Sequence, residues 1–247
     1  MDVAIVGASG YGGRELIWWL SHHPEARVKV AVSESSSGRP VSDVFPGFNG
    51  LVNLDCGTGL EKAKSCDVVF LAAEGGFAMK NAQELLLAGC KVIDLSADFR
   101  LRDPETYERW YGEHGAPELF GTGVYGLTEL YRDQLRDAKL VATPGCYPTA
   151  SVLALAPLAE QGLLSEVFVA AMQGTSGYGR SSDDLVHFSA MTENAFPYKA
   201  EGHRHRPEIE QELAALGSPA PVTFVPHLLP LDQGELSTCF AQLSEPT

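Results

Sequence analysis

The sequence predicts an α/β protein: a doubly wound parallel sheet of the Rossmann type over residues 1–147, followed by an α+β domain over residues 148–247. Three observations support this prediction. Strand-like and helix-like segments alternate through the first part, which is typical of a parallel sheet with crossover helices. The strand-like segments are continuously apolar, as expected when helices cover both faces of the sheet. A glycine-rich turn joins the first strand to the first helix, where such folds bind dinucleotides.

The elements of the first part follow one another at short intervals. We expect strands at residues 3–6, 28–32, 68–71, 92–95 and 140–142, and helices at 12–21, 61–64 and 77–88. Residues 97–135 are rich in turn residues and isolated aromatic side chains, so we expect a surface excursion with short helices there.

The second part has a different character, so we place the domain boundary near residue 147. A helix over 149–160 precedes a strand at 167–172 and a glycine- and serine-rich segment at 174–182. An aromatic turn at 196–198, a helix at 207–216 and two strands at 222–226 and 235–243 complete the chain.

Composition limits the possible functions. The 247 residues carry a net charge of −14, which disfavours nucleic acids and anionic membranes as partners. No apolar run is long enough to cross a bilayer, and the chain opens on a strand rather than on a cleavable leader. The 5 cysteines show no regular spacing and no Cys-x-x-Cys pair, which indicates a reducing compartment without a zinc site. We therefore expect a cytoplasmic protein without a metal.

The glycine turn is the first candidate site. Its spacing is G-x-x-G-x-x-G, and glycines there allow backbone N–H groups to approach a pyrophosphate at the start of a helix. We expect the cofactor to contact Gly7, Ser9, Gly10, Tyr11, Gly12 and Gly13.

The end of the second strand should select between NAD and NADP. An acidic residue such as Glu34 usually holds the 2′-hydroxyl of the ribose, whereas serines and an arginine accept a 2′-phosphate. Both signals are present. The hydroxyl cluster and the arginine favour NADP, so the predicted contacts are Ser33, Ser35, Ser36 and Arg39.

The candidate nucleophile is Cys146, in the segment Ala-Thr-Pro-Gly-Cys-Tyr-Pro-Thr at residues 142–149. A strand leads into this segment, Gly145 makes a turn, and Pro148 suits the first turn of a helix. The thiol therefore lies where unpaired N–H groups and the positive end of a helix dipole meet. That environment makes a thiolate available near neutral pH. A reactive thiol beside a dinucleotide fold suggests covalent chemistry coupled to hydride transfer.

The partners of this thiol are sought in the segment Gly-His-Arg-His-Arg-Pro-Glu at residues 202–208. Either His203 or His205 can serve as the acid or base, because a thiol acting on a carbonyl needs one nearby. The guanidinium groups of Arg204 and Arg206 suit an anionic substrate. The loop containing Ser176 and Gly177 either contacts cofactor or substrate or is an ordinary turn.

Seven segments together resemble the N-acetyl-γ-glutamyl-phosphate reductases, an arginine-biosynthesis family of the semialdehyde-dehydrogenase type. They occupy residues 7–11, 92–100, 124–129, 144–149, 176–180, 203–209 and 224–228, in the order found in that family. Pro-Gly-Cys-Tyr-Pro-Thr and His-Arg-His with Pro-Glu-Ile are the specific motifs; the glycine turn is shared with many oxidoreductases.

The resemblance implies that Cys146 attacks an acyl phosphate, that phosphate leaves as a thioester forms on the cysteine, and that NADPH reduces this thioester to the semialdehyde. It implies that Glu208 orients the catalytic imidazole. It also implies that the anionic substrate is held by arginines, namely Arg100, Arg180, Arg204 and Arg206. Similar enzymes are oligomers, so we expect a homo-oligomer.

The sequence departs from the family pattern in two places, and two alternative functions stay open. Residues 72–76 read Ala-Ala-Glu-Gly-Gly where the family commonly has Leu-Pro-His-Gly, and the catalytic domain looks truncated at its C-terminal end. One alternative is a reductase for N-acetyl-aminoadipyl phosphate of lysine biosynthesis, which is one carbon longer. The other is an inactive nucleotide-binding fragment.

Overall fold

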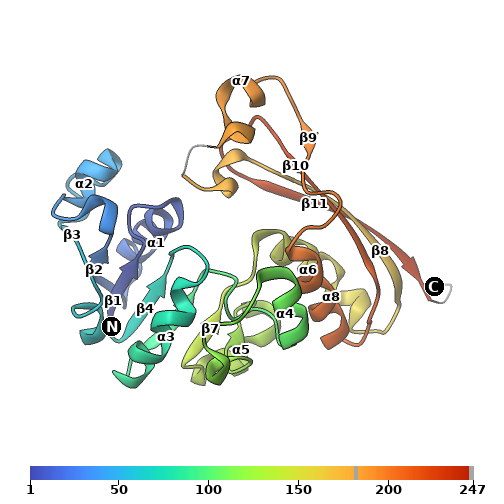
Figure 1. Ribbon diagram of the computed structural model, residues 1–247, viewed down its shortest axis with the longest axis horizontal. Helices are drawn as coiled ribbons and strands as arrows, with labels where there is room; N and C mark the ends of the chain where they lie inside the picture. The colour runs from blue at the N-terminus through green and yellow to red at the C-terminus, as the bar shows by residue number, and fades with distance from the viewer. Residues whose placement is uncertain (181–182, 245–247) are drawn as a thin grey trace. The chain divides into compact units, whose positions relative to one another are not determined.

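The computed structural model describes residues 1–180 and 183–244, so Ser181 and Ser182 of the predicted glycine- and serine-rich segment lie outside the described residues. The chain divides into two compact units (Figure 1). The first comprises Met1–Glu108 and Gly112–Thr143, and the second comprises Arg109–Tyr111 and Pro144–Thr247. Among the described residues, no helix has the length and apolar character that crossing a bilayer requires.

The first unit contains a 7-stranded sheet in the order β3-β2-β1-β4-β5-β7-β6, in which every pair of neighbours is parallel. Its strands are β1 (Asp2–Val6), β2 (Arg27–Val32), β3 (Cys56–Gly57), β4 (Val68–Leu71), β5 (Lys91–Asp94), β6 (Val124–Tyr125) and β7 (Leu140–Ala142). The predicted doubly wound parallel sheet is therefore confirmed. Sequence reasoning missed β3 and β6, because strands of 2 residues are too short to produce a hydrophobic pattern.

The helices of this unit are α1 (Tyr11–Ser21), α2 (Val41–Val44), α3 (Phe77–Leu87), α5 (Thr128–Asp137) and the greater part of α4 (Pro104–Tyr111), whose residues Arg109–Tyr111 belong to the second unit. The short helix predicted at residues 61–64 is a 3₁₀ turn at Ala63–Ser65. The predicted excursion over residues 97–135 holds α4, β6 and most of α5. Asp103 starts α4 by accepting a hydrogen bond from the N–H of Thr106, and Pro104 follows it at the first helical position.

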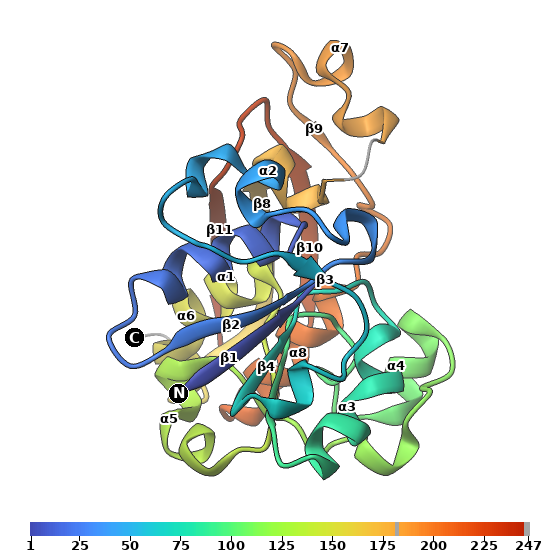
Figure 2. The ribbon, with the colours of Figure 1, turned by 90° about the vertical axis from the view of Figure 1, so that its left-hand side faces the viewer.

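Both faces of the sheet are covered, which explains the continuous apolar strands. Alternate residues of β1 belong to two core clusters: Val3 and Ile5 pack with Ile17 of α1. Ala4 and Val6 belong to the cluster that contains the buried face of α3. Figure 2 shows α1 and α3 on opposite sides of the sheet.

Close packing requires two glycines here, Gly7 in the turn between β1 and α1 and Gly13 in the first turn of α1. Gly7 has φ +83°, and a Cβ there would lie 2.1 Å from the carbonyl oxygen of Ala72. A Cβ on Gly13 would lie 2.3 Å from the carbonyl oxygen of Gly7. Both contacts are with backbone, so no side-chain rotation could relieve them. This packing fixes the start of α1 against the ends of β1 and β4.

The second unit contains a 4-stranded sheet in the order β11-β8-β10-β9. Its strands are β8 (Leu164–Gln173), β9 (Phe196–Pro197), β10 (Val222–Leu228) and β11 (Glu235–Leu243). Strands β8 and β10 are parallel, and the other two pairings are antiparallel. The helices are α6 (Cys146–Ala159), α7 (Phe188–Met191) and α8 (His205–Ala215). The long helices α6 and α8 lie side by side along one face of the sheet (Figure 1).

The opposite face of this second sheet exposes large apolar side chains. Leu236 and Phe240 of β11 are 60% and 61% exposed, and Phe168 of β8 is 43% exposed. Phe240 pairs directly with Phe168, and Leu236 pairs with Met172, so these side chains lie in neighbouring rows on one face. An apolar sheet face of this kind is characteristic of a surface that another protein chain covers.

Candidate active site

Cys146 is the first residue of α6, directly after its N-terminal cap Gly145. It is the exposed cysteine of the chain, whereas Cys56, Cys66 and Cys90 are buried and Cys239 is half-buried. Burial raises the pKa of each of those four thiols above its ordinary value. The thiol of Cys146 instead lies at the positive end of a helix dipole, where a thiolate is favoured.

Gln173 and Glu235 lie beside this thiol and were missed by sequence reasoning. The thiol of Cys146 donates to Oε1 of Gln173, with sulfur and oxygen 3.7 Å apart. Gln173 ends β8 and is the direct cross-strand partner of Glu235, which begins β11. Burial raises the pKa of the Glu235 carboxyl, and hydrogen bonding with Cys146 and Ser237 lowers it in part. No local sequence signal could have identified the two residues, since they meet Cys146 only through the register of β8 and β11.

The amide nitrogen of Gln173 is also hydrogen-bonded, which fixes the orientation of the side chain. Its Nε2 donates to the hydroxyl of Tyr198 over 2.8 Å, and that hydroxyl donates to the hydroxyl of Tyr147 over 3.4 Å. A Cβ on Gly177 would lie 2.5 Å from Oε1 of Gln173, so this predicted cofactor contact packs against the amide. The backbone N–H of Ser176 donates to the carbonyl of Asp232. The cofactor contacts predicted for Ser176 and Gly177 stay predictions.

The two candidate histidines occupy different positions. His205 faces the residue before the nucleophile, because a Cβ on Gly145 would lie 2.5 Å from Nε2 of its imidazole. His203 is packed among aromatic rings, with the centroid of Phe224 at 5.2 Å and that of Tyr198 at 5.7 Å. Its Nδ1 accepts the backbone N–H of His205 over 3.2 Å. Burial, together with the charges of nearby cations, lowers the pKa of His203 to about 4.

Glu208 connects the segment of the histidines to the start of α6. It is 1% exposed, and its Oε1 accepts the backbone N–H of Gly145 over 2.8 Å. A charge-assisted bond of this kind holds the chain in place immediately before Cys146. The orientation of an imidazole by Glu208 stays a prediction.

The predicted substrate arginines are spread over several segments. Arg206 forms an ion pair with Glu210, Nε to Oε1 at 3.0 Å, and the guanidinium of Arg204 lies 5.3 Å from the ring centroid of Tyr111. Arg180 is exposed at the end of the loop that follows β8. In the first unit, Arg100 donates to the carbonyls of Leu95 and Thr143, which follow β5 and β7. Substrate binding by these arginines stays a prediction.

The first unit contains a cavity of about 830 Å³ at the carboxyl ends of its central strands. Five of the predicted cofactor contacts line it: Gly7, Ser9, Gly10, Ser33 and Ser35. The hydroxyl of Ser9 lies 2.7 Å from that of Ser33, so the glycine turn and the end of β2 form one continuous wall. The remaining predicted contacts of this unit are not among the lining residues: Tyr11, Gly12, Gly13, Ser36 and Arg39.

The opposite wall of the cavity is the segment between β4 and α3, where the sequence departs from the family pattern. Residues 72–77 all line the cavity. Asp98, which is 1% exposed, accepts the N–H of Gly76 at 2.8 Å and that of Met79 at 3.1 Å. Asp98 therefore caps α3 and fixes this wall, a role that the sequence alone did not reveal.

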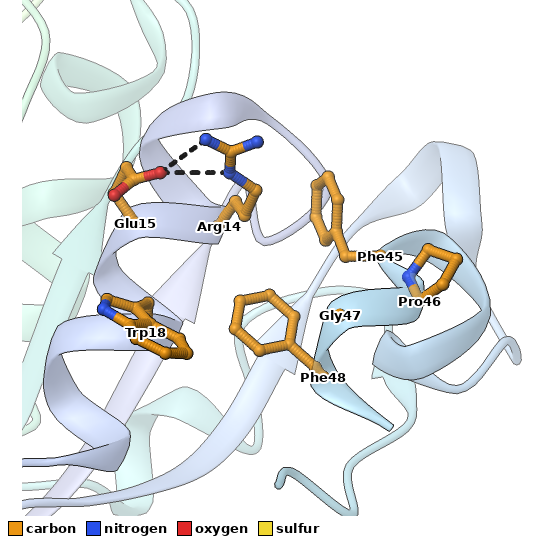
Figure 3. Close-up of a pocket in the computed structure, with 7 residues that line it drawn as sticks. All are labelled: Arg14, Glu15, Trp18, Phe45, Pro46, Gly47 and Phe48. Atoms are coloured by element: carbon orange, nitrogen blue, oxygen red, sulfur yellow. Dashed lines mark hydrogen bonds and ion pairs between the residues drawn. The ribbon is translucent and has the colours of Figure 1, made fainter. Parts of the chain in front are cut away.

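A second cavity in the first unit, of about 430 Å³, lies between α1 and the segment before β3 (Figure 3). Trp18, Phe45 and Phe48 face it, and Arg14 beside it hydrogen-bonds to Glu15. None of the predicted site residues lines this cavity. Among the described residues, no group of three or more His, Cys, Asp or Glu side chains is placed to hold a metal ion.

The chain matches two family models. Residues 2–138 match the model described as "Semialdehyde dehydrogenase, NAD binding domain", and residues 146–247 match "Semialdehyde dehydrogenase, dimerisation domain". The cavity with the glycine turn thus lies in a nicotinamide-dinucleotide-binding domain.

Proteins from two bacteria are similar to the whole chain. The N-acetyl-gamma-glutamyl-phosphate reductase of Halorhodospira halophila is 46% identical over 251 residues, which cover 100% of this chain and 73% of the relative. The enzyme of the same name from Pelotomaculum thermopropionicum is 46% identical over 252 residues, with the same coverage of both chains.

Solved structures share the fold. Aspartate semialdehyde dehydrogenase II of Vibrio cholerae, complexed with ASA, superposes with a TM-score of 0.75 at 17% identity, covering 100% of this chain and 75% of that one. The Candida albicans enzyme with NADP gives a TM-score of 0.69 at 18% identity, covering 100% and 72%. The chain therefore belongs to the semialdehyde dehydrogenase family of oxidoreductases, in the group named N-acetyl-gamma-glutamyl-phosphate reductases.

Proposed function

We propose that this chain reduces N-acetyl-γ-glutamyl phosphate to N-acetylglutamate semialdehyde and phosphate with a nicotinamide cofactor. The observation that carries the proposal is an exposed thiol at the start of α6, with an amide, a carboxyl and an imidazole around it. The names of relatives that are 46% identical supply the substrate. In this proposal the first unit binds the cofactor and the second unit carries out the covalent chemistry.

The first step uses Cys146 as the nucleophile. Its thiolate attacks the carbonyl carbon of the acyl phosphate, the bond from that carbon to the phosphate oxygen breaks, and inorganic phosphate leaves. The product is a thioester on Cys146. A thiol suits this role because sulfur is both a good nucleophile and a good leaving group. The N-terminus of α6 stabilises the thiolate, whereas an ionised Glu235 beside it opposes thiolate formation.

The second step converts the thioester to the aldehyde. The bound cofactor supplies the hydride. His205 is the better placed of the two histidines to protonate the developing oxyanion, because its Nε2 faces the backbone of Gly145 beside the nucleophile. Removal of that proton from the hemithioacetal then breaks the carbon–sulfur bond and regenerates the thiolate. His203 holds the backbone N–H of His205 and is kept neutral by its aromatic surroundings.

We assign substrate binding to arginines, and assembly to an apolar sheet face, of the same two units. The phosphate and carboxylate groups of the substrate require cations, and Arg100, Arg180 and Arg204 are our candidates. We also propose that the chain forms a homo-oligomer through the apolar sheet face of Phe168 and Phe240, since a match to a dimerisation domain covers these strands. Light scattering of wild type and Phe240→Glu tests this, because the charge should shift the oligomer toward monomer.

The assay follows absorbance of the reduced cofactor with N-acetyl-γ-glutamyl phosphate and with the acyl phosphate that is one methylene longer. We expect faster oxidation with the shorter substrate and loss of turnover in Cys146→Ser. Preference for the longer one would change the assigned substrate, with the thiol mechanism intact. Cofactor binding without turnover on either would support an inactive nucleotide-binding protein. Equal turnover in Cys146→Ser would end the thiol mechanism.

A further inference from the structure

The end of β2 presents a carboxylate to the cofactor cavity. Strand β2 ends at Val32, Ser33 continues in extended conformation, and Glu34 begins a 3₁₀ turn at Glu34–Ser36. Glu34 lines the cavity together with Ser33 and Ser35. In dinucleotide-binding folds this position faces the adenosine ribose, where an acidic side chain accepts hydrogen bonds from the 2′-hydroxyl.

A backbone group of the segment that follows β3 holds the carboxylate of Glu34 at this position. Its Oε1 accepts the backbone N–H of Gly59 over 3.1 Å, and Gly59 also lines the cavity. The end of β2 is further fixed because the carbonyl of Val32 accepts the N–H groups of Gly7 and Ala8 at 3.0 and 2.9 Å. A carboxylate has about four acceptor sites on its two oxygens, so one bond to Gly59 leaves it the capacity to accept from a ribose.

The cation expected for a 2′-phosphate is directed elsewhere. Nη2 of Arg39 donates to the carbonyl oxygen of Asp43 over 3.0 Å, and Arg39 is not among the lining residues. The charged residues that do line the cavity are Lys80 and four glutamates, namely Glu34, Glu61, Glu74 and Glu84. Lys64 forms ion pairs with both Glu61 and Glu84, so two cations, Lys64 and Lys80, stand against the four carboxylates. A phosphate on the ribose 2′-oxygen would thus meet an acidic wall.

We propose that this chain selects NADH over NADPH and that Glu34 is the residue that determines this selection. The inference deepens the proposed function and rests on it only in that the cavity takes a nicotinamide dinucleotide. It reverses the preference for NADP that the serines and Arg39 predicted from the sequence. The sequence could not show the direction of the Arg39 side chain. Its guanidinium binds the carbonyl of Asp43 in α2, and Arg39 does not line the cavity.

The test is direct binding of NADH and NADPH to the full chain, measured by the increase in nicotinamide fluorescence on titration. We expect NADH to bind about tenfold or more tightly than NADPH in the wild type. Glu34→Ser should reduce this ratio, and Glu34→Arg should reverse it. The control Glu118→Gln removes an equal charge at an exposed position outside the cavity and should leave the ratio unchanged.

Two outcomes would overturn the proposal. One is that NADPH binds the wild type as tightly as NADH, or more tightly. The other is that Arg39→Met weakens NADPH binding selectively whereas Glu34→Arg changes nothing, which would restore the 2′-phosphate site of the sequence prediction. Binding is read without turnover, so a chain that selects NADH but reduces no acyl phosphate would sink the proposed reaction and leave the cofactor assignment standing.

Discussion

The two sites of this chain are built in different ways. The cofactor cavity of the first unit is lined by glycines and serines at the ends of adjacent parallel strands and by charged side chains such as Glu34 and Lys80. The thiol site of the second unit is made of one polar side chain each from α6, β8, β11 and the start of α8. The position of the dinucleotide site is therefore set mainly by the fold, with single side chains such as Glu34 deciding which dinucleotide it selects, whereas the covalent site depends on individual side chains throughout. Substitutions should therefore affect the two sites in different ways.

The largest effect is expected in the thiol site, from His205→Asn. Loss of the group that transfers the proton should lower kcat by about 10²–10⁴-fold. The dissociation constant for the cofactor should stay unchanged, because His205 belongs to the second unit. Steady-state kinetics and a cofactor titration on one preparation measure both. A loss of cofactor binding in this variant would show that the two sites are not independent.

The next largest effect is expected in the glycine turn of the cofactor site, from the addition of one methyl group. Gly7→Ala should lower the free energy of unfolding by about 3 kcal/mol or more, since φ is +83° and the new Cβ meets the carbonyl of Ala72. Cofactor binding should weaken in parallel. The matched control is Gly10→Ala, whose Cβ has its nearest neighbour at 3.4 Å, and urea unfolding compares the two. Equal stabilities would show that the turn tolerates a Cβ at Gly7.

Glu235→Gln tests how the neighbouring carboxylate affects thiolate formation at Cys146. Removal of an ionised carboxylate beside Cys146 favours the thiolate, so the pH of half-maximal alkylation by iodoacetamide should fall by roughly one unit. Mass spectrometry of the peptide that contains Cys146 gives the rate at each pH. Glu166→Gln, near the opposite end of β8, is the charge control. An identical pH profile in Glu235→Gln would mean that the carboxyl is protonated throughout the range.

The smallest expected effect is the contribution of His203 to the pH dependence of folding stability. Its pKa is about 4 when folded and higher when unfolded, so the unfolded chain binds an extra proton as pH falls below about 6.5. Stability should then decrease by about 1 kcal/mol between pH 6.5 and 5, after a discount for partial solvent exposure. Urea midpoints at both pH values should show a smaller decrease for His203→Phe than for wild type.

Asp94 acts in the opposite direction in this pH range. Burial raises the pKa of Asp94 to about 6, so the folded chain binds this proton before the unfolded chain does. Asp94 therefore stabilises the folded chain, relative to the unfolded chain, as pH falls. The contribution of Asp94 is the same in wild type and in His203→Phe, so it cancels in the comparison of the two decreases. An equal decrease in both proteins would show that another group carries the pH dependence.

The sequence predicted those features that depend on neighbouring residues. The parallel sheet followed from continuous apolar strands, and Cys146 followed from a strand, a glycine turn and a helix start in immediate succession. The helix begins at Cys146 itself, three residues before the predicted start at Thr149. Short strands such as β3 left no pattern, because two residues cannot show periodicity.

The features that were missed depend on register and side-chain direction. Gln173 and Glu235 meet through the pairing of β8 with β11, which lie far apart in the sequence. The aromatic packing around His203 brings in Tyr198 and Phe224 from other segments. The direction of Arg39 away from the cavity depends on its bond to Asp43. None of these contacts has a local signature in the sequence.

The thioester on Cys146 can be observed by mass spectrometry of the chain after mixing with N-acetyl-γ-glutamyl phosphate in the absence of reduced cofactor. We expect an N-acetylglutamyl group attached to Cys146, released by hydroxylamine as a thioester should be, and absent from Cys146→Ser. Acylation of another residue, or reductase turnover by a chain in which Cys146 never becomes acylated, would contradict the account.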